Sequence, residues 1–186
     1  MEKQYDVGVV IGRFQPFHNG HECVLEHALE LCEQVVVVIG SAQESRLPHN
    51  PLTAAEREAM IRDSFYDELE VNPNRILFLS LADRIEFGNN ASWGEYVMEA
   101  IQNEFHIIPS VVFEGYEAER RDWYGSLSVT VMQISRNVLP ISATEIREAI
   151  LNGDEKFYKV WCANGTEHWF NFLKGVLEEC ENKRKQ

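Results

Sequence analysis

Short runs of hydrophobic residues recur along the first 134 residues of this chain and are separated by longer segments of mixed pattern. The runs are rich in β-branched residues and apolar on both faces, which is typical of strands buried inside a parallel sheet. They predict five strands, at residues 7–11, 34–40, 75–81, 110–113 and 127–134.

The intervening segments have a helical period. From His21 onward, hydrophobic residues through Cys32 share one face, and Glu22, Glu26, Glu30 and Glu33 fall on another, which predicts an amphipathic helix with a glutamate-rich outer face. Two further helices begin with capping boxes, one at Thr53 and one at Ser142. Helices are predicted from residue 21, at 53–66, at 92–105, from 142, at 154–161 and at 167–180.

Strands that alternate with helices imply a parallel sheet with right-handed crossovers. The predicted fold is therefore α/β, a Rossmann-like doubly wound parallel sheet of about five strands followed by C-terminal helices. A single domain is expected over residues 1–186, with a core at about 5–151 and a helical part at about 152–186. A ligand crevice is expected at the carboxyl ends of the strands.

Composition narrows the classes of partner. The formal net charge of −13 and the absence of a basic stripe argue against nucleic-acid binding. The four cysteines have no metal-type spacing and are expected to be reduced thiols of a cytoplasmic protein. No signal peptide or hydrophobic segment of membrane-spanning length is visible, so no membrane partner is expected.

The segment from Gly12 to His21 connects the first predicted strand to the first predicted helix, where parallel folds bind anions. Gly20 allows close approach of the backbone, and His18 and His21 can donate hydrogen bonds to phosphate oxygens. Arg13 adds a positive charge. A capping or core role would explain either histidine alone, whereas the pair around a glycine favours a phosphate site. No third ligand is spaced to complete a metal site.

A second candidate segment opens the helix at Ser142. Its N-cap leaves the following amides facing outward, and Thr144 and Arg147 share one helical face. Hydroxyl, amides and guanidinium can thus converge on one phosphate. An ordinary capping box with a surface arginine explains the same pattern, so this motif alone leaves both interpretations open.

A third candidate region contains Asp83, Asn90 and Trp93, around the start of the helix predicted at 92–105. An aromatic ring beside a crevice can stack on a planar heterocycle, and an asparagine can recognise an amide. Asp83 could support a hydrated Mg²⁺, although a lone loop aspartate is more often a turn former. Trp93 taken alone is more typical of a core residue.

Together these segments resemble the nucleotidyltransferase superfamily, which is marked by a His-x-Gly-His motif and a later Ser-x-Thr-x-x-Arg motif. They are similar, over roughly residues 5–151, to its archaeal-type nicotinamide-mononucleotide adenylyltransferases. That family also leads one to expect a basic residue just before Asn50, where this chain has His49 and, three residues earlier, Arg46. The segments that carry the resemblance are residues 12–21, 40–43, 50–57, 90–93 and 141–147.

The resemblance implies roles for individual residues. His18, His21, Arg13 and Arg147 would act in catalysis, and Trp93 would stack on the nicotinamide ring. Asn90 would contact the carboxamide of that ring, and Asp83 would lie at the same mononucleotide site. The residues that would surround ATP are Gly12, Arg13, Phe14, His18, His21, Ser142, Thr144 and Arg147.

The implied reaction is adenylyl transfer from ATP, with Mg²⁺, to nicotinamide mononucleotide, which yields NAD and pyrophosphate. The attacking phosphate is already an anion, so the reaction needs positioning and charge stabilisation rather than a general base. Transfer to another phosphorylated acceptor, CTP as donor, and a non-catalytic nucleotide sensor stay open as alternatives. So do a homo-oligomeric state, the preference for the amidated or the deaminated mononucleotide, and the role of residues 152–186.

Overall fold

A five-stranded parallel sheet with the strand order β3-β2-β1-β4-β5 forms the centre of the molecule. The structure, a computed structural model, describes residues 3–84, 90–115, 124–134 and 140–184. The order reverses between β1 and β4, which places the expected crevice at their carboxyl ends. The predicted fold is confirmed, with strands β1 (Tyr5–Gly12), β2 (Cys32–Ile39), β3 (Ile76–Ser80), β4 (Val111–Gly115) and β5 (Thr130–Ile134).

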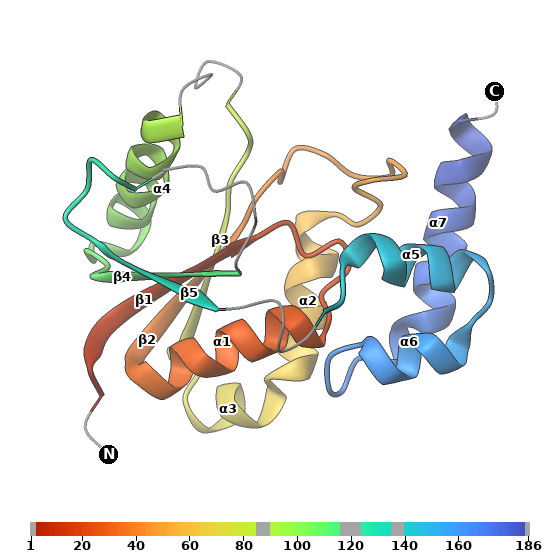
Figure 1. Ribbon diagram of the computed structural model, residues 1–186, viewed down its shortest axis with the longest axis horizontal. Helices are drawn as coiled ribbons and strands as arrows, with labels where there is room; N and C mark the ends of the chain where they lie inside the picture. The colour runs from red at the N-terminus through yellow and green to blue at the C-terminus, as the bar shows by residue number, and fades with distance from the viewer. Residues whose placement is uncertain (1–2, 85–89, 116–123, 135–139, 185–186) are drawn as a thin grey trace.

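Helices cover both faces of this sheet (Figure 1). They are α1 (Asn19–Leu31), α2 (Ala54–Ser64), α3 (Tyr66–Val71), α4 (Asn90–Phe105), α5 (Ala143–Leu151), α6 (Glu155–Trp161), the short 3₁₀ helix η1 (Glu167–Trp169) and α7 (Phe170–Arg184).

Three details differ from the predicted elements. Helix α3 was not predicted, because it buries none of its residues and so leaves no periodic apolar signal. Cys32 begins β2 instead of closing α1, since the helical period runs directly into the β-branched run of that strand. Glu22 is only 5% exposed, although its spacing placed it on the outer face with Glu26.

Alternate residues of the strands face two separate hydrophobic clusters. Val9, Val36 and Val38 pack with Val97 and Ile101 of α4 on one face of the sheet. The other face packs against α1, α2 and the C-terminal helices, through Val10, Val35, Val37, Ile39, Val111 and Phe113. The parallel sheet is thus buried on both sides, as its near-continuous hydrophobic strands predict.

The C-terminal helices extend this second cluster beyond the end of the sheet (Figure 1). Ile146 and Ile150 of α5 and Leu173 of α7 are buried in it, and the Tyr158 hydroxyl of α6 donates to the Thr166 carbonyl at 2.8 Å. One hydrophobic cluster therefore extends from α1 to α7.

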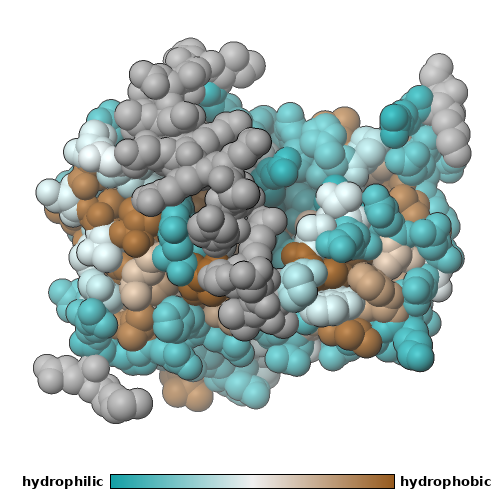
Figure 2. Space-filling view, viewed as in Figure 1, coloured by the Kyte–Doolittle hydropathy of each residue, from teal (hydrophilic) through white to brown (hydrophobic). Residues whose placement is uncertain are grey.

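The surface is mixed in polarity. Figure 2 shows hydrophilic residues along much of the rim of one face, with hydrophobic residues in several separate patches. Within the described ranges, no helix has the length and hydropathy required to cross a membrane. Cys23, Cys32, Cys162 and Cys180 are all free thiols, and burial raises the pKa of Cys32 and of Cys162 to about 11.

Candidate active site

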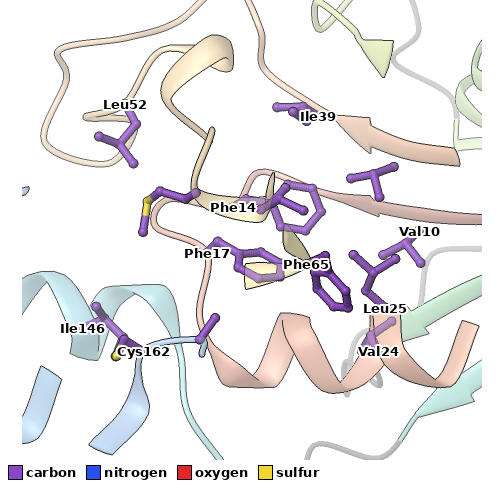
Figure 3. Close-up of a cluster of buried hydrophobic side chains, with 14 of the residues drawn as sticks. Val10, Phe14, Phe17, Val24, Leu25, Ile39, Leu52, Phe65, Ile146 and Cys162 are labelled. Carbon is purple, nitrogen blue, oxygen red and sulfur yellow. The ribbon is translucent and has the colours of Figure 1, made fainter. Parts of the chain in front are cut away.

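The loop between β1 and α1 is held by two aromatic side chains. Phe14 and Phe17 are 2% and 1% exposed, and their rings meet edge to face with centroids 5.8 Å apart. Figure 3 shows both rings in the core beside Phe65, between α1 and α2. Because these two side chains fill the core, the positions around them, Arg13 and His18, are fixed at the carboxyl end of the sheet.

The two histidines of this loop lie face to face. Their ring centroids are 3.8 Å apart, and the Nδ1 atom of His18 accepts a hydrogen bond from the Gly20 amide at 3.1 Å, which caps α1. In a neutral imidazole that bond leaves Nε2 of His18 as the donor. A Cβ atom at Gly20 would lie 3.0 Å from the His18 ring, so the glycine is needed for this packing. The His21 ring also stacks on Phe17.

Helix α5 brings Arg147 to the same loop. Its Nη1 atom donates to the Gln15 carbonyl at 2.7 Å, across 132 residues of sequence, and its Nη2 atom donates to the Thr144 hydroxyl at 3.1 Å. A Cβ atom on Gly20 would lie 3.3 Å from Ile141, the residue just before the α5 cap. The loop that carries the two histidines and the segment from Ser142 to Arg147 therefore meet, as the resemblance implies.

Ser142 has a defined structural role at this point. Its hydroxyl accepts a hydrogen bond from the Glu145 amide, and the Glu145 carboxylate accepts one from the Ser142 amide, which completes the predicted capping box. The cap fixes the first turn of α5 and its outward amides. Contacts of Ser142 and Thr144 with ATP phosphates stay predictions.

Arg57 of α2 is fully buried and was not among the predicted site residues. Its guanidinium donates to the carbonyls of Arg13 at 2.8 Å, Gly40 at 2.6 Å and Ser41 at 3.3 Å, and Nε donates to the Thr53 carbonyl at 3.1 Å. One side chain thereby ties the carboxyl ends of β1 and β2 to the start of α2. The 50–57 segment carried the resemblance, but nothing in its pattern distinguished this arginine from a surface one.

Three arginines approach one another around the loop. Burial lowers the pKa of Arg57 to about 10, with nearby Asp83 opposing and Arg13 adding to the shift. Burial and Arg13 also lower the pKa of Arg147. Mutual repulsion of this kind means that the cations crowd one region, which is the field that an anionic ligand neutralises. These arginines gather at one loop in a chain whose formal net charge is −13.

Gln15 connects this loop to the 50–57 segment. Its side-chain amide donates to the Leu52 carbonyl at 2.9 Å and accepts from the Leu52 amide at 2.9 Å, while the buried Gln15 carbonyl receives Arg147. The Gln15–Pro16 peptide bond is cis. Gln15 is a second residue that sequence reasoning did not place in the site, although it belongs to the motif that carried the resemblance.

Asp83 is held at the neighbouring strand ends. Its carboxylate accepts hydrogen bonds from the Ser41 hydroxyl at 2.6 Å and the Gln43 amide at 3.4 Å, and its own amide donates to Gln43 at 2.9 Å. The loops after β2 and β3 are thus joined beside the crevice. In the ranges that the structure describes, no group of three or more His, Cys, Asp or Glu side chains is placed to hold a metal ion, and Asp83 belongs to no such group.

Trp93 lies in the first turn of α4. Its ring is half-buried and packs at 5.6 Å from the ring of Tyr96, whose hydroxyl donates to the Ala82 carbonyl at 3.3 Å. Tyr96 thereby links the Trp93 ring to Ala82, the residue before Asp83. Asn90 is the first residue of α4, but its side chain is outside the described part of the structure, and so are residues 85–89.

The loop after β2 offers little free positive charge. Arg46 forms a bidentate ion pair with the Glu56 carboxylate, with nitrogen–oxygen distances of 2.7 and 2.5 Å, and it also donates to the Pro51 carbonyl. His49 is exposed and lies 3.5 Å from Glu44. Both basic residues near Asn50 thus have a glutamate partner, and a role for either one in ligand binding stays a prediction.

The sequence is similar to known proteins over most of its length. Residues 9–149 match the model of the cytidylyltransferase-like family. The nicotinamide-nucleotide adenylyltransferase of Thermococcus sibiricus is 33% identical over 169 residues, which cover 91% of this chain and 85% of that protein. The enzyme of the same name from Thermococcus kodakarensis is 35% identical and covers 79% and 73%.

A solved structure has the same fold. It is that of a bifunctional NMN adenylyltransferase/ADP ribose pyrophosphatase from Francisella tularensis, complexed with AMP and a manganese ion. The TM-score is 0.66 at 24% identity, over 97% of this chain and 53% of that protein, so this chain spans about half of its length.

Proposed function

The chain belongs to the cytidylyltransferase-like family, among its nicotinamide-nucleotide adenylyltransferases, and from this premise we propose which of its residues carry out the reaction. The enzyme transfers the adenylyl group of ATP to nicotinamide mononucleotide, and the products are NAD and pyrophosphate. The observation that supports these roles most strongly is the hydrogen bond from Arg147 to the Gln15 carbonyl, because it joins the two phosphate motifs.

The triphosphate binds where these motifs meet. Arg13 and Arg147 hold the β- and γ-phosphates, and the amides at the start of α5, fixed by the Ser142 cap, face the same anion. Thr144 adds a hydroxyl on the Arg147 face of this helix. Gly12 and Phe14 shape the loop on which the nucleotide lies.

The 5′-phosphate of the mononucleotide attacks the α-phosphate of ATP in line, and the bond to pyrophosphate breaks. Because the nucleophile is already an anion, no general base is needed. His18 and His21 donate hydrogen bonds to the oxygens on which negative charge increases. The stacking of the two rings and the hydrogen bond from the Gly20 amide to His18 hold the donors in place before substrate arrives. Little reorganisation is therefore required in the transition state.

The mononucleotide occupies the adjacent strand ends. Trp93 stacks on the nicotinamide ring, Asn90 recognises its carboxamide, and Asp83, fixed by Ser41 and Gln43, borders the same site. Mg²⁺ enters as the ATP complex, since this ion typically binds through substrate phosphates and water with few protein ligands. We also propose a cytoplasmic location, to which four free cysteines are suited.

Incubation of the purified protein with ATP and Mg²⁺ and each candidate acceptor tests this function. NAD should form from nicotinamide mononucleotide with stoichiometric pyrophosphate, identified by mass. The deaminated mononucleotide, flavin mononucleotide and phosphopantetheine, and CTP in place of ATP, serve as comparison substrates. Tight nucleotide binding without any turnover would favour a sensor instead.

A further inference from the structure

Glu22 lies one residue after the second histidine and is the buried acid of α1. Its side chain is 5% exposed, whereas Glu26, one turn later on the same helix, is exposed. Burial of a carboxylate is costly unless hydrogen bonds replace the lost water. A hydrophobic residue would pack there at lower cost, so the contacts of Glu22 need an explanation beyond packing.

Those contacts connect three separate parts of the chain. One Glu22 oxygen accepts a hydrogen bond from the Ser64 hydroxyl at 2.6 Å, at the end of α2. Both oxygens accept from the backbone amide of Asn164, at 3.1 and 3.2 Å, in the turn between α6 and η1. The first turn of the histidine helix is therefore tied to α2 and to the C-terminal part.

The turn that supplies this amide is itself fixed. Gly165 has φ +74°, and a Cβ atom there would lie 2.8 Å from the Asp63 carbonyl, so the turn is pressed against the end of α2. The Thr166 hydroxyl donates to the Ala163 carbonyl at 2.7 Å, and the Thr166 carbonyl accepts from Tyr158 at 2.8 Å. The Asn164 amide is thus presented by a rigid element rather than by a loose loop.

A second contact joins the same two regions. The side-chain amide of Asn19, between the two histidines, reaches the Val160 carbonyl of α6 at 3.5 Å. Figure 3 shows Cys162, at the end of α6, beside Ile146 and next to the segment that carries Phe17. The C-terminal part, which lies outside the matched residues 9–149, touches the histidine turn directly.

We propose that Glu22 is a positioning residue for adenylyl transfer. Through its carboxylate, the C-terminal helices hold the first turn of α1, and with it His18 and His21, at the geometry that the transition state requires. The inference rests on the proposed function and gives residues 152–184 a part in it. Displacement of a catalytic group by about 1 Å can lower a rate about 10²-fold.

Glu22→Gln tests the proposal with little change of volume. The amide oxygen can still accept, but both Glu22 oxygens lie within 3.2 Å of the Asn164 nitrogen, so the new N–H₂ group faces that donor in either orientation. We expect kcat to fall roughly 10- to 100-fold, with KM for both substrates within about twofold of wild type, since the residues proposed to bind them are untouched. Glu26→Gln is the matched control on the exposed face of α1 and should retain wild-type kcat.

Amide hydrogen exchange gives a readout that does not depend on turnover. In Glu22→Gln, the amides of residues 19–22 should exchange faster, while those of the β1 and β2 strands keep their wild-type rates. Ser64→Ala, which removes one donor only, should lower kcat in the same direction by a smaller factor. If Glu22→Gln folds poorly, Ser64→Ala serves as the test variant in its place.

A lower melting temperature with wild-type kcat, measured well below the unfolding transition, would reduce Glu22 to a structural residue and overturn the proposal. Unchanged exchange at residues 19–22 would do the same. Wild-type protein without turnover would instead refute the proposed function itself. Wild-type turnover therefore tests the proposed function, and the ratio of variant to wild-type kcat tests the role of Glu22.

Discussion

The two ends of the active site are built in different ways. The proposed phosphate end consists of the loop at residues 13–21 and the start of α5. It is fixed by the hydrogen bond from Arg147 to the Gln15 carbonyl, 132 residues away in sequence, and by the stacked rings of His18 and His21. The mononucleotide end joins the loops after β2 and β3 to α4, through the Asp83 carboxylate and the ring pair of Trp93 and Tyr96.

Under the roles proposed above, the two ends have different tasks in the reaction. At the phosphate end, cations and imidazoles act on atoms whose charge changes during the reaction, so their loss should lower kcat. At the mononucleotide end, an aromatic ring and fixed polar groups act on a heterocycle that does not react. Their loss should raise KM for one substrate and leave the chemical step unchanged.

The largest effect is expected from His21→Ala. Removal of a donor that acts on the transition state should lower kcat by about 10²–10³-fold, with little change in KM. His27→Ala, on the same helix but hydrogen-bonded to Glu30 at the surface, is the control. Steady-state kinetics with a correctly folded variant decide the point, and near-wild-type turnover would remove His21 from the mechanism.

Arg147→Ala should have the next largest effect. A charge-assisted hydrogen bond to a phosphate contributes about 1.5–3 kcal/mol, so kcat/KM for ATP should fall by roughly 10- to 100-fold. Arg62→Ala removes an exposed arginine that pairs with Glu58 and should leave the kinetics unchanged. A rise in KM for the mononucleotide alone, with kcat and KM for ATP as in wild type, would contradict the placement of Arg147 at the phosphate end.

Trp93→Ala tests the opposite end. Stacking of an aromatic side chain on a planar base contributes about 1–3 kcal/mol to binding. Its loss should raise KM for nicotinamide mononucleotide at least about fivefold, while KM for ATP and kcat stay near wild type. Tyr66→Ala removes an exposed aromatic residue of α3 as a control. A selective rise in KM for ATP would show that the two ends were assigned in the wrong order.

The smallest effect is expected at Arg46, beside the site but bound to Glu56. The hydrogen-bonded Arg46 guanidinium lowers the pKa of Glu56, so the pair stabilises the fold above the ordinary carboxyl pKa of 4.5 and loses this contribution as the pH falls through the lowered value.

Arg46→Met should therefore lower the free energy of unfolding at pH 7 by about 1 kcal/mol, with a smaller difference from wild type at pH 3. Chemical denaturation at the two pH values measures this, and Lys183→Met, which breaks the exposed pair with Glu179, is the control. A large loss of kcat in Arg46→Met would instead indicate that Arg46 is the basic residue that the family resemblance leads one to expect before Asn50.

Much of this architecture could be predicted from the sequence because its signals are local. Buried strands, capping boxes at Thr53 and Ser142, and a glycine between two histidines each follow from a few neighbouring residues. The parallel topology then brings strand ends together. The meeting of the histidine and Arg147 segments was implied by the family resemblance, because the residues alone left the Ser142 motif open.

The residues that sequence reasoning missed act over long range. Arg57 lies on the same helix as exposed Arg62, and only the fold reveals that it binds three carbonyls in the loops after β1 and β2. Glu22 has the spacing of a surface glutamate, and its partners are 42 and 142 residues away. Periodicity reports the face of a helix, but it carries no information on a polar partner that covers that face.

A crystal structure with a non-hydrolysable ATP analogue and Mg²⁺ tests the central claim most directly. The triphosphate should lie between the two motifs, with its oxygens within hydrogen-bonding distance of His18 or His21 on one side and of Arg147 and the first amides of α5 on the other. A triphosphate that contacts only one of these segments, or binds elsewhere, would contradict the account.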